Sequence, residues 1–166
     1  AVGLEGDARK TFLGDLYMRQ LREVGGFTHV RSFELMDLDR GLTAYYLMIG
    51  TRHHLGLKVM NEAMWALDPA GGIRFSGFAG GQQMLFDEVD MSPLRDAILT
   101  KFAGQSVGVE AIERFVIEET DFKTTQYKKQ VLKPLEADGT IECVSTGKRN
   151  RGTFPAGTVL RVPAVQ

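Results

Sequence analysis

Basic side chains gather in two short stretches near the end of the sequence. The segment 124–137 has one acid against three lysines, Lys128, Lys129 and Lys133. The turn 145–152 has no acid and three cations, Lys148, Arg149 and Arg151. Cations at this density can neutralise phosphates, and each neutralised phosphate releases bound counterions. The two stretches therefore predict a local anion-binding surface.

Amide and hydroxyl side chains lie among these lysines. Glutamine can form two hydrogen bonds with the edge of an adenine, so Gln126 and Gln130 are candidates for base contacts. The predicted nucleic-acid-binding residues are Thr125, Gln126, Lys128, Lys129, Gln130, Lys133, Lys148, Arg149 and Arg151. The alternative is that the lysines form a solvated helix face and that the arginines belong to a soluble turn.

Other residues that could do chemistry carry weaker signals. His53 and His54 are adjacent, so they point in different directions and chelate poorly; a polar pair at a helix start is the favoured interpretation. Asp37 and Asp39 share an alternation that a hairpin turn also explains. Cys143 follows Ile141 at spacing two, which favours a core thiol. No GxSxG, HExxH, P-loop or GxGxxG motif is present, so the sequence predicts neither catalytic nor metal-binding residues.

Composition limits the classes of function. The 166 residues carry a net charge of −1, so attraction to nucleic acid must come from a local patch. No apolar run approaches the roughly 18 residues of a membrane span, which predicts no membrane partner. The single cysteine excludes an internal disulfide and favours the cytoplasm. The chain begins without Met on a helical pattern, and we expect it to be part of a longer protein.

The lysine-rich segment must be positioned by the elements around it. N-capping residues and glycine stops predict three helices. The first runs from Ser92 as N-cap to Gly104, the second from Ser106 to about residue 121, and the third over 124–137. In the third helix the buried stripe is Tyr127, Val131 and Leu135. Strands over 140–146 and 158–162 complete the order of a winged helix-turn-helix, whose third helix enters the major groove of DNA. Pro134 predicts a kink before the last turn of that helix.

The first 69 residues predict a mixed α/β unit. A helix ending at Gly25 and Gly26 is followed by an antiparallel strand pair over residues 27–37 and 42–52. The second strand is nearly continuously apolar from Ala44 to Ile49, as in a strand buried on both faces. The next helix, 54–69, places Leu57, Met60, Met64 and Leu67 on one stripe. Residues 70–91 then begin with a glycine-rich stretch and are expected to form a connector before a domain over 92–166.

Several separated blocks carry a resemblance to a known family. They include YYLMIGTRHHLGLKVMNEAMWALDP, QQMLF, GVEAIERFVIEETDFKTTQYKKQVLKPLEADGTIECV and RGTFPAGTVLRV. Over about 130 residues the chain resembles the three-Cys-motif partner protein family. The resemblance implies an N-terminal methyltransferase-like Rossmann domain, of which residues 1–69 would be the closing elements, followed by a winged helix-turn-helix.

The first strands and the glycine-rich cofactor turn of such a domain are missing from this sequence. The resemblance therefore implies no S-adenosylmethionine-binding residue here, although a longer parent protein could bind that cofactor and act as a methyltransferase. The function expected is nucleic-acid targeting; the alternative is a docking module that binds the three-Cys-motif protein or another chain. An unpaired edge at Tyr45–Ile49 also predicts a homodimer.

Overall fold

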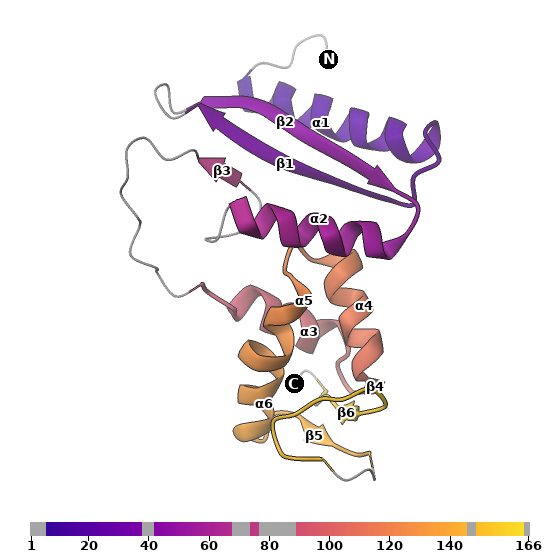
Figure 1. The fold of residues 1–166 in the computed structure, drawn as a ribbon, viewed down its shortest axis with the longest axis vertical. Helices are drawn as coiled ribbons and strands as arrows, with labels where there is room; N and C mark the ends of the chain where they lie inside the picture. The colour runs from indigo at the N-terminus through magenta and orange to yellow at the C-terminus, as the bar shows by residue number, and fades with distance from the viewer. Residues whose placement is uncertain (1–5, 38–41, 68–73, 77–88, 146–148, 165–166) are drawn as a thin grey trace.

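The computed structural model describes residues 6–37, 42–67, 74–76, 89–145 and 149–164. These residues form an N-terminal lobe from α1 to β3 and a C-terminal domain from α3 to β6. Figure 1 shows the two parts stacked, with α2 of the lobe facing α4 of the domain. None of the helices in these ranges is long and apolar enough to cross a membrane.

The N-terminal lobe is a three-stranded sheet between two helices. Strand β1 (His29–Asp37) pairs antiparallel with β2 (Leu42–Thr51) and parallel with β3 (Arg74–Ser76). Helix α1 (Gly6–Glu23) lies on one face of this sheet and α2 (His54–Leu67) on the other (Figure 1). The predicted antiparallel pair is confirmed. Strand β3 is not predicted by the sequence, because the glycine-rich segment favours a connector without secondary structure.

The burial expected for the lobe is wrong in two places. Among the described residues, strand β2 is an edge strand with a neighbour on one side only, and Tyr45, Tyr46 and Leu47 are 72%, 45% and 43% exposed. Helix α2 buries Leu57 and Met64 as expected but leaves Leu67 half exposed. It buries Asn61 and Trp65 instead, because this helix packs against both the sheet and α4.

The C-terminal domain has three helical segments and a small antiparallel sheet, as the winged-helix order predicts. The helices are α3 (Ser92–Lys101), α4 (Val109–Glu119) and a continuous helix made of α5 (Thr124–Gln126), η1 (Tyr127–Leu132) and α6 (Lys133–Ala137). We refer to residues 124–137 as the recognition helix. The sheet has the order β4-β6-β5, from Ser106–Gly108, Val159–Arg161 and Glu142–Cys143.

A single apolar core joins these elements. It combines side chains of all three helices with the sheet, including Ile98, Ile112, Val116, Tyr127, Val131, Leu135 and Leu160. The predicted stripe of Tyr127, Val131 and Leu135 is at most 4% exposed and is thereby confirmed. This core fixes the recognition helix against the rest of the domain.

Two predicted helix starts are wrong. The N-cap position of α3 is Met91, and the Ser92 amide is instead bound by Asp90 Oδ1 at 2.8 Å. Residues from Ser106 form β4, because they pair with β6, and α4 begins only at Val109. The predicted glycine stop is present, since Gly104 follows α3 with φ +70°.

Candidate nucleic-acid interface

The recognition helix contains a π-helical segment where the sequence predicts a proline kink. Buried residues occur as the pairs 126/127, 131/132 and 135/136, separated first by five positions and then by four. The five-residue interval coincides with η1, which closes with a bond from the Lys133 amide to the Lys128 carbonyl. Pro134 lacks an N–H and its ring would crowd the Gln130 carbonyl, so the wider turn before it relieves both problems.

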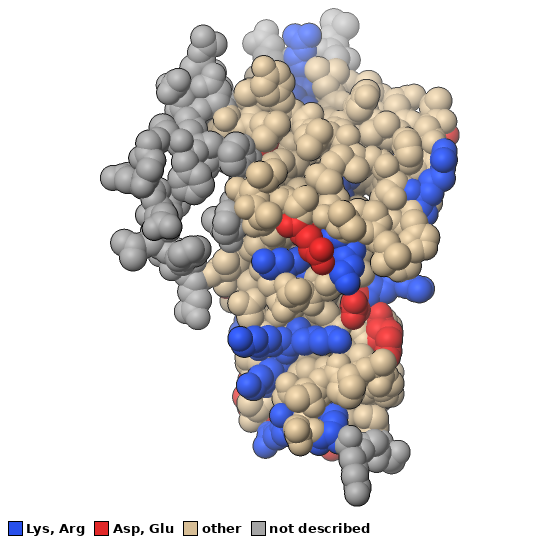
Figure 2. Space-filling model, viewed as in Figure 1, with Lys and Arg blue, Asp and Glu red and all other residues tan. Residues whose placement is uncertain are grey.

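The outward face of this helix is basic. Thr125, Lys129, Gln130 and Lys133 are exposed, as the sequence predicts for a surface that contacts a ligand. Within the described ranges no carboxylate lies within ion-pair distance of Lys129 or Lys133. Figure 2 shows lysine and arginine side chains gathered over this helix and the end of the domain below it. The two ammonium groups are therefore available to an anion.

Lys128 and Gln126 have different surroundings from their neighbours. The Lys128 ammonium lies 3.8 Å from a carboxylate oxygen of Glu113, and its side chain is 40% exposed. Gln126 is 5% exposed, and its Oε1 accepts a 2.9 Å hydrogen bond from the Lys123 amide at the start of the helix. Gln126 therefore caps the helix and does not face a ligand, contrary to its predicted role in base contact.

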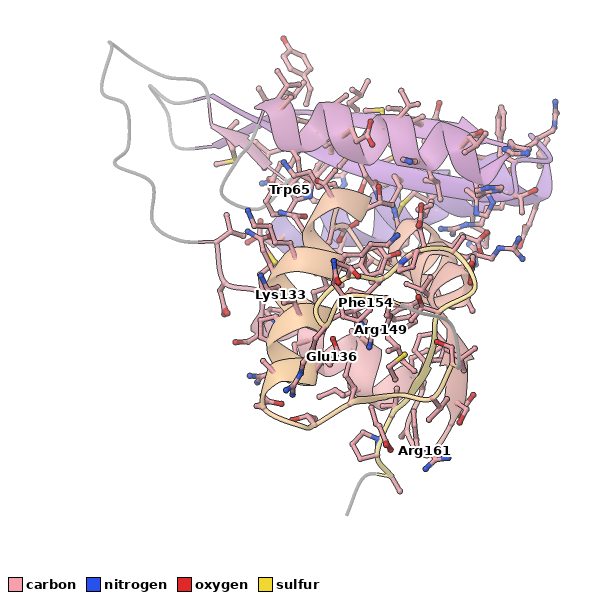
Figure 3. The ribbon with its side chains drawn as sticks, turned by 60° about the horizontal axis from the view of Figure 1, so that its bottom comes forward. Trp65, Lys133, Glu136, Arg149, Phe154 and Arg161 are labelled. Atoms are coloured by element: carbon pink, nitrogen blue, oxygen red, sulfur yellow. The ribbon has the colours of Figure 1, made fainter. Side chains whose placement is uncertain are left out.

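The wing, which we define as β5, β6 and residues 149–158 between them, directs one arginine inward. The Arg149 guanidinium pairs with the Glu136 carboxylate, and the two side chains are 11% and 8% exposed. Arg149 Nη1 also donates to the Thr153 carbonyl at 2.9 Å, and the guanidinium lies over the Phe154 ring. Figure 3 shows Glu136, Arg149 and Phe154 side by side, with Arg161 well apart.

Glu136 connects the recognition helix to the wing at two further points. Its carboxylate accepts a 2.7 Å hydrogen bond from the Gly152 amide, and its carbonyl accepts one of 2.8 Å from Arg151 Nη2. Gly152 has φ +79°, and a Cβ there would lie 3.2–3.4 Å from the aliphatic stem of Lys133. The wing thus rests directly on the last turns of the helix.

These contacts change the acidity of Glu136. The hydrogen bond from Arg149 lowers the pKa of the Glu136 carboxyl, and the Gly152 amide adds to this effect against the opposing cost of burial. The carboxylate is held in its charged form, as expected for an acid with a paired cation and a backbone donor.

The predicted wing cations are therefore not equivalent to the helix lysines. Arg149 is occupied inside the protein, and Arg151 binds the carbonyls at the C-terminal end of α6. Lys148 lies outside the described residues. Thr125, Lys129, Gln130 and Lys133 lie on one exposed face of the helix. The two arginines instead bond the wing to the helix.

Glu136 is the functional residue that the sequence analysis overlooked. It is the only acid of the recognition helix, and it follows Leu135 on the buried side. An acid on a buried stripe needs a cation, and the turn 149–151 supplies two. An acid on a buried stripe, together with two arginines in the next turn, is the sequence pattern that could have predicted this ion pair.

The contacts of the other candidate residues indicate structural roles. The His53 and His54 rings stack at 4.5 Å, and His53 Nδ1 accepts a hydrogen bond from the Leu55 amide, so the pair marks the start of α2. Cys143 is half-buried against the core; burial raises its pKa, but bonds with Ser145 and Arg149 lower it more, so the net shift is downward. No group of three His, Cys, Asp or Glu side chains in the described ranges could hold a metal ion. Asp39 lies outside those ranges.

A shallow hollow of about 320 Å³ borders the exposed helix face. Its walls come from both parts of the chain and comprise Trp65, Val89, Lys123, Thr125, Gln126, Lys129 and Gln130. The exposed face of the recognition helix therefore borders Trp65 of the N-terminal lobe.

Comparison with known proteins agrees with this geometry. No curated protein and no solved structure matches the chain. Residues 75–148 match the family model described as the GMT-like wHTH domain. Taken with three helices, a β4-β6-β5 sheet and a wing on the third helix, this match identifies the C-terminal part of the chain as a winged helix-turn-helix domain.

Proposed function

We propose that the winged helix of this chain binds duplex DNA through the outward face of its recognition helix. The observation that carries the proposal is the pair of lysines, Lys129 and Lys133, which are exposed on this helix and have no acid partner in the described ranges. Gln130 and Thr125 lie on the same face and would contact base edges, while Lys128 would add a partly neutralised charge.

The geometry of a winged helix supports a contact with the major groove. A major groove admits one α-helix, and phosphates on its two walls are reached by cations along the helix flank. Arg149 and Arg151 would support this contact indirectly, by holding the wing against α6. Lys148, which lies outside the described residues, stays a predicted phosphate contact.

We place this module in a longer protein of the three-Cys-motif partner type, on the strength of the resemblance in its separated sequence blocks. In that proposal the N-terminal lobe is the end of a methyltransferase-like sheet, and the winged helix delivers that sheet to nucleic acid in the cytoplasm. S-adenosylmethionine would belong to the parent protein, and the present chain would not act as an enzyme alone.

Fluorescence anisotropy with a labelled duplex tests the proposal. Affinity should fall with salt, with a slope of log K against log salt of roughly −0.9 per phosphate contact. Binding that is absent at low salt, or that does not respond to salt, would contradict DNA recognition by these lysines.

A second candidate function is docking of another protein chain. It is favoured by strand β2, LTAYYLMIGT, which has no charged residue. This strand exposes Tyr45 and Tyr46 at an edge that no other described strand covers. We predict that two copies of the chain associate through this edge. Light scattering should show a dimer that Tyr45→Lys converts to a monomer; a monomeric mass at all concentrations would refute it.

A further inference from the structure

We propose that the N-terminal lobe positions the recognition helix, through Arg31, Asn61 and Trp65. All three hold the turn between α4 and the recognition helix, which we define as residues 120–123. That turn sets the angle between the two helices of the helix-turn-helix. The positioning role rests on contacts alone, and its effect on DNA affinity rests on the proposed function.

Arg31 of β1 binds the end of α4. Its Nη2 donates to the carbonyl of Glu118 at 3.0 Å and to that of Thr120 at 2.9 Å. Its Nε lies 3.6 Å from the Asp121 carboxylate. The last carbonyls of a helix have no partner within the helix, and a cation there also meets the negative end of the helix dipole. Arg31 is thus the C-terminal cap of α4, supplied by a different part of the chain.

Two side chains of α2 bind the turn itself. Trp65 Nε1 donates to the Asp121 carbonyl at 2.6 Å, and the Trp65 ring packs against Phe122 with centroids 5.7 Å apart. Asn61 Nδ2 lies 3.4 Å and 3.5 Å from the carbonyls of Thr120 and Phe122. Asn61 and Trp65 are 2% and 3% exposed, so their donor groups are shielded from solvent. The whole turn is therefore bound from the lobe side.

The recognition helix starts immediately after the turn that these three side chains bind. The Lys123 amide is the one that Gln126 caps, and the Lys123 ammonium lies 5.6 Å from the centre of the Trp65 ring. A change in the lobe that moves α2 or β1 must move the turn or break these bonds.

The contacts within the domain leave this task to the lobe. Inside the turn, Thr120 Oγ1 donates to the Val116 carbonyl and accepts from the Phe122 amide. Among the described residues, no side chain of the domain itself donates a hydrogen bond to the carbonyls of Glu118, Asp121 or Phe122. Ile117 of α4 is buried, yet it lies outside the core cluster of the domain, as expected for a residue that faces α2.

The test compares Arg31→Met with Arg52→Met in the 166-residue chain. Arg52 is a matched control, because it also donates to two carbonyls, Gly25 and Gly26 at 3.2 Å, and lies over a ring, Phe27, away from the joint. Amide hydrogen exchange requires no nucleic acid. We expect Arg31→Met to speed exchange over residues 120–127 by about tenfold or more and Arg52→Met to leave that segment unchanged.

DNA affinity is the second measurement. Arg31→Met should weaken duplex binding about tenfold with the same salt slope, since the phosphate contacts are kept and only their alignment is lost. Arg31→Lys, which retains a cationic donor, should recover part of the affinity. Trp65→Phe keeps an aromatic side chain, though a smaller one, and removes the Nε1 donor. It should show a smaller loss, and it replaces Arg31→Met in the test if that variant does not fold.

The outcomes separate the two proposals. Unchanged exchange at the turn in both Arg31→Met and Trp65→Phe would overturn the positioning role. Faster exchange with unchanged affinity would keep the positioning role and overturn its effect on DNA binding. If the unaltered chain binds no duplex while exchange at the turn rises, the lobe still positions the helix, and DNA binding is the part that fails.

Discussion

The lysines of the recognition helix and the arginines of the wing lie on neighbouring elements and carry the same charge. Lys129 and Lys133 extend into solvent without an acid partner in the described ranges, whereas Arg149 is 11% exposed and paired with Glu136. Arg151 also points back, to the carbonyls that end α6. One group of cations is free to meet a ligand, and the other holds the surface together.

The side-chain chemistry explains this division. Arginine has a planar guanidinium with five donors, so it can satisfy a carboxylate, a thiol and carbonyls at once in a restricted space. Lysine has a compact, strongly hydrated charge on a long stem and is rarely buried. Net charge in a sequence segment therefore does not reveal which cations are available. The partner that each cation finds in the fold decides it.

Removing the carboxylate at the centre of the wing should have the largest effect. Glu136→Ala leaves Arg149 buried without its acid, and breaking a buried ion pair costs roughly 3–5 kcal/mol. Urea unfolding followed by circular dichroism measures the change. The control is Glu142→Ala, whose partner Arg161 lies 3.8 Å away with both side chains more than half exposed; that change should cost less than about 1 kcal/mol. Equal losses in the two variants would refute a structural role for the inward arginine.

The outward lysines should act on binding instead of stability. Lys129→Met with Lys133→Met removes two charges but keeps the stem that packs on Gly152. The salt slope of duplex binding should flatten by about 1.8, that is, two contacts, while the unfolding free energy stays unchanged. Lys101→Met is the control, since Lys101 is paired with Glu119 on another surface. A slope that stays the same would leave the helix lysines as a solvated face.

The two glutamines offer a finer comparison on one helix. Gln130→Ala should change the preference between duplex sequences by about 1–3 kcal/mol, because Gln130 is exposed among the lysines. Gln126→Ala should leave the preference alone and cost about 1 kcal/mol of stability through the lost cap. Competition with a panel of duplexes, together with urea unfolding, separates the two. Altered preference in Gln126→Ala would contradict the burial of that side chain.

Acidification should produce the smallest effect. The pKa of Glu136 is lowered from 4.5 in the folded protein, so its contribution to stability is complete above about pH 4.5 and is lost as the pH falls through the folded-state pKa. Glu136→Gln has no carboxylate to protonate. The unfolding free energy of the unaltered chain should therefore fall more steeply below pH 4.5 than that of the variant. Parallel pH profiles would contradict the pairing with Arg149.

Sequence reasoning predicted the domain better than the lobe. The order of helices and strands in the winged helix, and the buried positions Tyr127, Val131 and Leu135, follow from helical spacing and from the glycine stop after α3. The lobe was harder, because apolar runs such as Ala44–Ile49 look alike in a buried strand and in an open edge. What distinguishes them is the number of neighbouring strands, which depends on distant segments.

The candidate site also has a part that the sequence predicts and a part that it does not. Exposure of Lys129, Gln130 and Lys133 follows from the stripe that the same helix buries. The inward turn of Arg149 depends on the tertiary meeting of the wing with Glu136, and the capping of the α4 end by Arg31 joins residues 87 and 89 positions apart. Contacts over such separations leave no periodic pattern to detect.

The π-helical segment gives the recognition helix an unusual response to changes in length. A bond that spans five positions encloses one residue more than a regular turn, and each residue of a regular helix advances the face by about 100°. Deleting one exposed residue between Tyr127 and Leu132 would let an ordinary turn close, because the buried pairs would then lie four positions apart throughout. Tyr127 and Leu135 would still face the same core, whereas a deletion in a regular turn, such as one in α4, would rotate the helix face by about 100°. The extra residue of this turn therefore makes it the place where the recognition helix could lose one residue and keep its register with the core.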